Sequence, residues 1–260
     1  MPSYNFDRVS DQYDQTRGLP PGLPERIARW VLSRLPKDPA ITELGVGTGR
    51  IAVPFIQAGV RYTGFDISEQ MLERLRAKLQ GEMQRSQIML HDITQPLPLP
   101  DRSQDAVIAV HILHLVDSTK ALEQVRRVLK PGGALVWGYE AGEEQNAHKM
   151  LRDRFHAEAV ALGYHGRDYH AQIGRELLAR WGAAATQHVI ATWSEEESLQ
   201  AHIDRLRAKV FSFTWGMTDQ QLHEAAERVT AWAEETFGDL SLPRISERRF
   251  VIDWYVLGGT

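Results

Sequence analysis

The sequence contains no cysteine. This absence excludes disulfides, thiolate metal sites and cysteine nucleophiles, and it is compatible with a reducing compartment such as the cytoplasm. The ten histidines are scattered along the chain and form no HxxxH pair of the kind that holds zinc on one face of a helix. We therefore expect no bound metal and no chemistry at a cysteine sulfur.

Long apolar runs and an excess of basic charge are also lacking. The most apolar stretch, AVIAVHILHLV, is too short to cross a bilayer, and the chain does not start with the cationic and apolar segments of an export signal. The formal net charge is -4, and acidic residues lie among the basic clusters, whereas nucleic-acid binders present a basic face. We expect a cytoplasmic protein with a small-molecule partner, no membrane span and no nucleic-acid partner.

The sequence does contain an alternation of short β-rich runs with longer helical periods. Several runs are nearly continuous in Val, Ile and Leu, which is typical of strands buried on both faces of a parallel sheet. The pattern predicts a doubly wound α/β fold. The expected strands are residues 40–44, 61–65, 87–91, 105–110 and 134–139.

The simple alternation ends after residue 139. The later periodicities predict helices over 146–162, 172–181, 196–210 and 219–237, with strands over 187–193 and 250–256. We expect one domain over 1–260 with a helical cap inserted in its C-terminal half. Its expected parts are amino-terminal helices over 1–35, a ligand-binding core over 36–140, a region containing the cap over 141–246 and a final strand over 247–260.

A glycine-rich turn, ELGVGTG, follows the first expected strand and contains Glu43, Gly45, Gly47 and Gly49. Alternating glycines let a ligand approach the backbone closely, and the amides of a helix that starts near Arg50 suit an anionic group. Dinucleotide-binding domains use the spacing GxGxxG instead of this GxGxG. The charge of Glu43 disfavours a pyrophosphate and favours an ammonium group, which indicates an amino-acid-like ligand.

Two further strands end in carboxylates. Asp66 closes GFD, where a carboxylate can accept both hydroxyls of a ribose, as nicotinamide-binding folds also do. Asp92 follows the third strand, where an acceptor suits an adenine amino group, and Ile67 and Ile93 are placed to sandwich the base. Alternatively, Asp66 caps the helix that opens at Ser68, and Asp92 caps a turn.

The segments ELGVGTGR, GFDIS, HDI, DAVIAVHILHLV and LKPGG follow one another in this order over residues 35–140. Together they resemble the class I S-adenosylmethionine-dependent methyltransferases, in the small-molecule branch (methyltransferase type 11) that is related to quinone and lipid methyltransferases. The resemblance implies a Rossmann-like, mostly parallel sheet of seven strands. It also implies S-adenosylmethionine as methyl donor, S-adenosylhomocysteine as product and no metal.

The cofactor contacts that this resemblance implies are distributed over several strand ends. Gly45, Gly47 and Gly49 would hold the methionine part, Asp66 the ribose, Ile67 the adenine face and Asp92 the adenine amino group, with His111 facing the reacting end.

The amino-terminal YNFDRVSDQYDQTRG resembles the segment that folds over the cofactor in such enzymes. Tyr13 and Arg17 match its YDxxR pattern, and Arg17 would pair with the cofactor carboxylate. The alternative is an ordinary amphipathic helix that packs on the sheet.

Methyl transfer is an in-line displacement on a sulfonium carbon, so the enzyme mainly positions donor and acceptor. If the acceptor must lose a proton, His111 is the candidate base, with His114 as the alternative. The aromatic residues Phe211, Trp215 and Tyr139 predict a pocket for a partly apolar metabolite.

Two other functions are compatible with parts of this pattern. A nicotinamide-dependent oxidoreductase would use a similar sheet, but the GxGxG spacing and Asp92 weigh against it. A non-catalytic S-adenosylmethionine-binding module would keep the same motifs. Nucleic-acid methylation is disfavoured because VHIL stands where an NPPY-like tetrapeptide would follow the fourth strand.

Overall fold

A computed structural model describes residues 19–81, 84–143, 146–164 and 169–257. Its contacts divide the chain into two compact units. The first unit comprises Met1–Tyr139, His170–Ala191 and Phe250–Thr260, and the second comprises Glu140–Tyr169 and Thr192–Arg249. The expectation of a single domain over 1–260 therefore stays a prediction.

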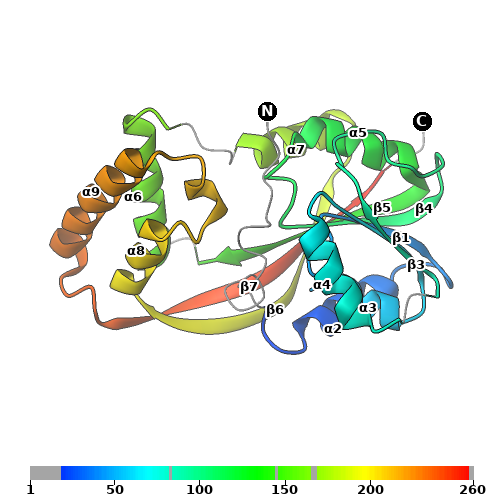
Figure 1. The fold of residues 1–260 in the computed structure, drawn as a ribbon, viewed down its shortest axis with the longest axis horizontal. Helices are drawn as coiled ribbons and strands as arrows, with labels where there is room; N and C mark the ends of the chain where they lie inside the picture. The colour runs from blue at the N-terminus through cyan, green and yellow to red at the C-terminus, as the bar shows by residue number, and fades with distance from the viewer. Residues whose placement is uncertain (1–18, 82–83, 144–145, 165–168, 258–260) are drawn as a thin grey trace. The chain divides into compact units, whose positions relative to one another are not determined.

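The chain forms a seven-stranded sheet in the order β3-β2-β1-β4-β5-β7-β6 (Figure 1). The neighbours from β3 to β5 pair in parallel, and every residue of the central β1 is buried. The expected doubly wound α/β fold with a mostly parallel seven-stranded sheet is confirmed. The strands are β1 Ala40–Leu44, β2 Arg61–Asp66, β3 Ser86–Leu90, β4 Gln104–Val110, β5 Leu129–Gly142, β6 Ala185–Ser198 and β7 Pro243–Val256.

The last three strands are longer than their sequence patterns predict. Each of β5, β6 and β7 has 14 residues, and each runs from one compact unit into the other. The additional residues are largely exposed and polar, as in SEEES at the end of β6. These residues extend the strands through backbone hydrogen bonds, while their side chains stay largely outside the core. Their sequence therefore lacks the apolar alternation from which a strand is predicted.

Helices of the first unit cover both faces of its part of the sheet (Figure 1). Helices α2, α3 and α4 lie on one face and α5 and α7 on the other, as expected for parallel strands joined by crossovers. Helix α7 therefore belongs to the sheet unit, although its sequence falls within the region expected to contain the cap. These helices are α2 Leu23–Leu32, α3 Ala52–Gln57, α4 Glu69–Leu79, α5 Ser118–Val128 and α7 Tyr169–Arg180.

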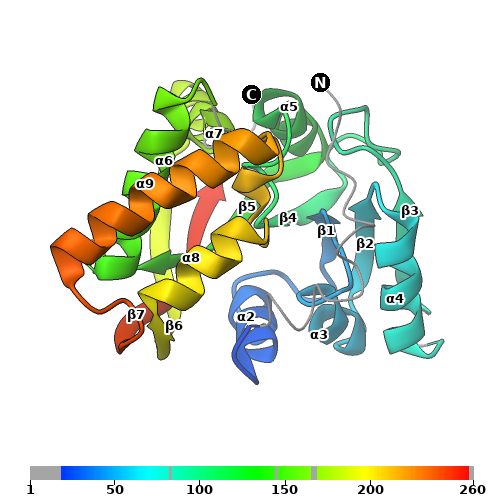
Figure 2. The same ribbon diagram turned by 60° about the vertical axis from the view of Figure 1, so that its left-hand side comes forward.

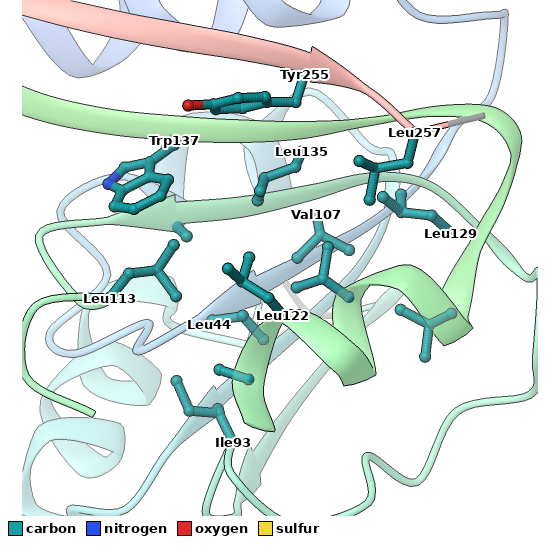
Figure 3. Packing of buried hydrophobic residues seen from close by; sticks show 14 of the residues in the cluster. Leu44, Ile93, Val107, Leu113, Leu122, Leu129, Leu135, Trp137, Tyr255 and Leu257 are labelled. Atoms are coloured by element: carbon teal, nitrogen blue, oxygen red, sulfur yellow. The ribbon is translucent and has the colours of Figure 1, made fainter. Parts of the chain in front are cut away.

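A hydrophobic core fills the space between the sheet and the α5 face (Figure 3). Leu44 and Val107 come from the central strands, Leu122 comes from α5, and Trp137 and Tyr255 come from β5 and β7. Leu44, Val107 and Leu122 are fully buried. This packing holds the carboxyl ends of β1 and β4 rigidly, and the glycine loop and His111 follow those ends.

The second unit is built on three helices, α6 (Ala147–Ala161), α8 (Leu199–Arg207) and α9 (Asp219–Phe237), which pack against one another (Figure 2). Their apolar faces enclose a separate core that includes Leu151, Phe155, Ile203 and Val229. A capping box at Thr218 starts α9, and a 3₁₀ turn, η2 (Ser212–Thr214), precedes it. Among the described residues, no helix has the length and apolar content that a membrane crossing needs.

Candidate cofactor site

The glycine loop between β1 and α3 has left-handed backbone at all three glycines, with φ of 68° at Gly45, 54° at Gly47 and 83° at Gly49. A side chain at Gly45 would stand 2.7 Å from the side chain of Ile112, and one at Gly49 would collide with Leu75. The positive φ and these side-chain contacts together favour glycine at the two positions. No atom of the described residues lies within 4 Å of the Cβ position of Gly47, so this part of the structure leaves the central glycine open to a ligand.

Helix α3 begins at Ala52 and has only six residues, whereas the sequence predicts a helix start near Arg50. A helix of this length carries a weak dipole. The loop amides themselves are therefore the groups that can meet an anion. Lys78 holds the loop from α4, because its Nζ donates to the Thr48 carbonyl at 2.9 Å, a contact that no motif predicts.

Asp66 ends β2 and reaches across to the glycine loop. Its Oδ2 accepts a hydrogen bond from the Gly47 amide at 2.8 Å, and its Oδ1 accepts one from the Ser68 amide at 3.0 Å. The cap of α4 is Ser68 itself, whose side chain accepts from the Met71 amide. Asp66 is therefore not the helix cap, and it joins the open glycine to the end of the neighbouring strand.

Asp92 follows β3, and the backbone brings it toward Asp66, because the His91 amide donates to the Asp66 carbonyl at 2.8 Å. The Oδ1 of Asp92 accepts from the amide and the hydroxyl of Thr94, at 2.9 and 2.8 Å. The expected turn cap is thus present. Among the described residues, no hydrogen bond is found to its Oδ2, so one oxygen remains for an amino group.

The two isoleucines expected to sandwich an adenine differ in exposure. Ile67 is half-buried at the end of β2, so part of its side chain remains accessible to a ring. Ile93 is only 4% exposed and packs in the core cluster with Leu97 and Phe65. Ile67 therefore presents the larger surface to a base, and the role of Ile93 stays a prediction.

Glu43 lies in the interior of the sheet, 2% exposed. Its carboxyl accepts a hydrogen bond from the hydroxyl of Tyr62 on β2. Burial raises the pKa of Glu43 from 4.5 to about 8, against the lowering effects of Tyr62 and Arg50. Burial and the Glu43 charge likewise raise the pKa of Tyr62. The expected pairing of Glu43 with an ammonium group stays a prediction, and Tyr62 is a partner that the sequence pattern does not reveal.

His111 follows the last residue of β4 with a φ of 53°. A residue other than glycine in this region stores about 1–3 kcal/mol of strain and is held there by its surroundings. Its amide donates to the Gly138 carbonyl at 3.2 Å, and its ring meets Phe250 edge-on at 6.4 Å. The next residue, Ile112, covers Gly45. His111 therefore lies at the same strand edge as the glycine loop.

The three expected acceptor-pocket residues fall in two different units. Phe211 and Trp215 belong to the second unit and Tyr139 to the first. Phe211 stacks on Phe213 at 5.7 Å, and the Trp215 indole donates to the Lys209 carbonyl at 2.7 Å. The structure does not bring all three together within one unit, so a shared pocket stays a prediction.

Tyr139 belongs to a polar network that the sequence does not suggest. Its hydroxyl donates to the buried Asp253 at 3.3 Å, and Gln187 donates to both, at 3.0 and 3.1 Å. Arg175 of α7 completes the network with an ion pair to Asp253 at 3.2 Å. Burial, followed by the charge of Asp253, raises the pKa of Tyr139. These four residues come from distant segments, which is why no local motif marks them.

Tyr13 and Arg17 lie outside the described residues, so their expected cofactor contacts stay a prediction. Within the described ranges, no group of three His, Asp or Glu side chains is arranged to hold a metal ion.

The core of this chain is similar in sequence to known methyltransferases. Residues 42–137 match the family model described as a methyltransferase domain. A demethylmenaquinone methyltransferase of Clavibacter sepedonicus is 36% identical over 204 residues, which cover 70% of this chain and 82% of that protein. A methyltransferase of Mycobacterium tuberculosis is 31% identical over 137 residues, 52% of each chain. The chain thus spans about half the length of the mycobacterial relative.

A solved structure of a candidate methyltransferase from Bacillus halodurans C-125 has the same fold. The superposition has a TM-score of 0.59, covers 90% of this chain and 99% of that one, and has 16% sequence identity. Likeness at this identity extends to the fold alone.

Proposed function

Since the chain belongs to the class I S-adenosylmethionine-dependent methyltransferases, we propose that it transfers the methyl group of that cofactor to a small, partly apolar metabolite. The observation that supports this most directly is the open backbone at Gly47, joined by hydrogen bonds to Asp66 and followed by Asp92 at the next strand end. Because the chain belongs to this family, the alternative function of a nicotinamide-dependent oxidoreductase is no longer supported.

The described residues fit the chemical groups of the cofactor. The Gly47 region would accept the methionine part, because no side chain of the described residues occupies that space. Each oxygen of Asp66 accepts from one backbone amide and would accept a ribose hydroxyl with its second lone pair. The Oδ2 of Asp92 would accept from the adenine amino group. Ile67 would cover a face of the base. When bound, the cofactor supplies an electrophilic methyl group on a sulfonium.

The residues of this chain then mainly position the acceptor and manage its proton. The strained backbone of His111 holds its ring at the carboxyl edge of β4, beside the loop that Ile112 covers. A histidine there can accept a proton from a hydroxyl or amine acceptor as the methyl group is transferred. No further base is required, because displacement at a sulfonium carbon depends chiefly on near-attack geometry.

The acceptor class follows from aromatic residues and from the Clavibacter relative. Phe211, Phe213 and Trp215 lie together in one segment of the second unit, and aromatic side chains favour apolar rings. Demethylmenaquinone, named for that relative, is the acceptor to test first. A cytoplasmic location and the absence of a nucleic-acid partner stay predictions.

A thermal-shift comparison tests the cofactor. S-adenosylhomocysteine at about a hundred times its dissociation constant should stabilise the protein by about 2.7 kcal/mol, whereas NADH should not. A shift with NADH alone would contradict the proposal. If S-adenosylhomocysteine raises the melting temperature but no acceptor is methylated, the protein is a non-catalytic cofactor-binding module.

The variant Gly47→Val tests the site, since its side chain would fill the open space at the loop. Gly59→Val is a matched control, because Gly59 also has positive φ and open space around its Cβ position but lies at the end of α3. Both variants suffer similar backbone strain. We expect loss of S-adenosylhomocysteine binding in Gly47→Val only, and equal binding in both would refute the assignment.

A further inference from the structure

The second unit contains a cluster of basic side chains that the proposed methyl transfer does not use. It joins three elements: His148 and Arg152 lie one turn apart on α6, His202 and Arg205 lie one turn apart on α8, and Arg248 lies on β7. Residues four apart, or three apart, share one face of a helix. We call these five residues the basic cluster. The acidic residues that face it are Glu140 of β5, Glu195 and Glu197 of β6 and Asp153 of α6.

Arg152 is the member without a partner. It is half-buried, yet within the part of the chain that the structure describes it makes no hydrogen bond and no ion pair. Burial, followed by the charges of Arg248 and Arg205, lowers the pKa of its guanidinium, whereas Asp153 and Glu195 raise the pKa in part. A half-buried cation that has no directly paired anion is destabilising.

Neighbouring donors also lack hydrogen bonds. The Nε atoms of Arg205 and Arg248 are buried without a hydrogen-bond partner among the described residues, although the Nε of Arg248 lies 3.9 Å from the carboxylate of Glu195. The terminal nitrogens of these two residues are already engaged, since Arg205 pairs with Glu197 at 2.9 Å and Arg248 with Glu140 at 3.0 Å. Buried N–H donors normally find an acceptor, so these two Nε atoms lack an acceptor at hydrogen-bond distance.

Two buried histidines complete the arrangement. His202 is 2% exposed and His148 is 6% exposed, and their rings meet at 5.6 Å. The Nδ1 of His202 lies 3.1 Å from Glu197, which assigns the proton to that nitrogen. The Nε2 atoms of both rings are buried and have no hydrogen-bond partner in the described structure, although the Nε2 of His148 lies 3.9 Å from the carboxylate of Glu197.

The charges around the histidines favour their neutral forms. Burial is the largest cause that lowers the pKa of both rings, and Arg152 lowers both further, joined by Arg205 at His202. Glu197 raises both values in part. An anion beside Arg152 would reverse this repulsion, so its binding would draw protons onto the rings.

We propose that the basic cluster of the second unit is an oxyanion site, in which Arg152 is the anchor, Arg205 and Arg248 supply further donors, and His148 and His202 take up protons as a carboxylate or a phosphate-like group binds. The site lies within one compact unit and does not depend on methyl transfer. Its ligand is a small molecule with an anionic oxygen group, and the side chains of Arg205 and Arg248, 43% and 24% exposed, leave it reachable from solvent.

Calorimetric titration of the full chain with sulfate and with benzoate, against chloride at equal ionic strength, tests the proposal. Sulfate keeps its charge from pH 8 to pH 5, so any pH dependence belongs to the protein. Preference for sulfate would assign a phosphate-like ligand and preference for benzoate a carboxylate. Binding should tighten as pH falls, by up to about tenfold per pH unit for each histidine that takes up a proton. No binding of either anion at millimolar concentration would overturn the proposal.

Arg152→Gln should weaken anion binding by about tenfold or more, because the variant loses one charge-assisted hydrogen bond to the anion. In the absence of anion it should raise the melting temperature, because it removes an unpaired repelled cation, whereas a merely structural arginine would lower it. Arg154→Gln is the matched control on the same helix, because Arg154 is already paired with Glu158 at 2.8 Å.

Equal loss of anion binding in the two variants, or none in either, would refute the site. Binding of S-adenosylhomocysteine should be normal in both variants, which separates this result from a failure of the proposed methyl transfer.

Discussion

Replacement of Glu43 by Gln should stabilise the protein at neutral pH and remove a pH dependence of its stability. Glu43 is buried beneath the glycine loop, where its only described hydrogen-bond donor is Tyr62. Gln keeps the shape of the side chain and an oxygen that can accept from the Tyr62 hydroxyl. It cannot ionise, so it removes the free energy required to keep a carboxyl protonated in the folded state.

The magnitude follows from the pKa of Glu43, raised from 4.5 to about 8. In unfolded chains the carboxyl is ionised at pH 7, whereas in the folded state it is mostly protonated. One pKa unit corresponds to about 1.4 kcal/mol, so this proton uptake destabilises the folded state by about 3 kcal/mol at pH 7 and by about 1 kcal/mol at pH 5. Stability is therefore greatest below the unfolded pKa and falls as pH rises toward 8.

Urea denaturation of the parent protein and of Glu43→Gln at pH 5, 6, 7 and 8 measures this difference. The amide adds a donor that needs a partner, which lowers the stability of the variant equally at each pH. The diagnostic quantity is therefore the slope of the stability difference with pH. Glu69→Gln, at a carboxylate that is 48% exposed, is the control for the same substitution outside the core. A flat difference for Glu43→Gln would refute the reasoning.

The same variant tests the expected ammonium contact. An ammonium group of the bound cofactor beside Glu43 would lower the pKa of the carboxyl, so binding would release a proton. S-adenosylhomocysteine should then bind more tightly as pH rises from 6 to 8, by up to about tenfold per unit. In Glu43→Gln the affinity should not change with pH. The same pH dependence in both proteins would exclude Glu43 as its origin.

Three other substitutions have expected outcomes. His111→Gly should stabilise the fold by about 1 kcal/mol, because glycine accepts the positive φ. The same variant should slow methyl transfer to an acceptor that loses a proton, and unchanged turnover in a steady-state assay would exclude His111 as the base. Asp253→Asn should destabilise by about 1–3 kcal/mol in denaturation, since Arg175 loses its ion pair; unchanged stability would show that solvent screens the pair. Leu122→Ala should cost about 2–5 kcal/mol at a fully buried site, and a loss below about 1 kcal/mol would contradict the core packing.

Local sequence determined much of the fold of the first unit. The continuous apolar runs and the helical stripes between them predict β1 to β5 and their helices. Strands that are buried on both faces of a parallel sheet consist almost entirely of apolar residues, so the sequence identifies them. The GxGxG loop and the strand-end carboxylates likewise lie within a few residues of the strands that present them. Asp66 and Asp92 could therefore be predicted as neighbours at one edge of the sheet.

Tertiary structure alone decided how these residues are used. Positive φ is required at all three glycines, but only packing against Ile112 and Leu75 separates Gly45 and Gly49 from the open Gly47. Only folding brings Tyr62 to Glu43 and Asp253 to Arg175, since these pairs join separate segments. The unpaired state of Arg152 likewise depends on β7 and α8, which contribute Arg248 and Arg205. The sequence by itself determined the elements and the family motifs, whereas burial and charge environment arise between segments and were decided by the fold.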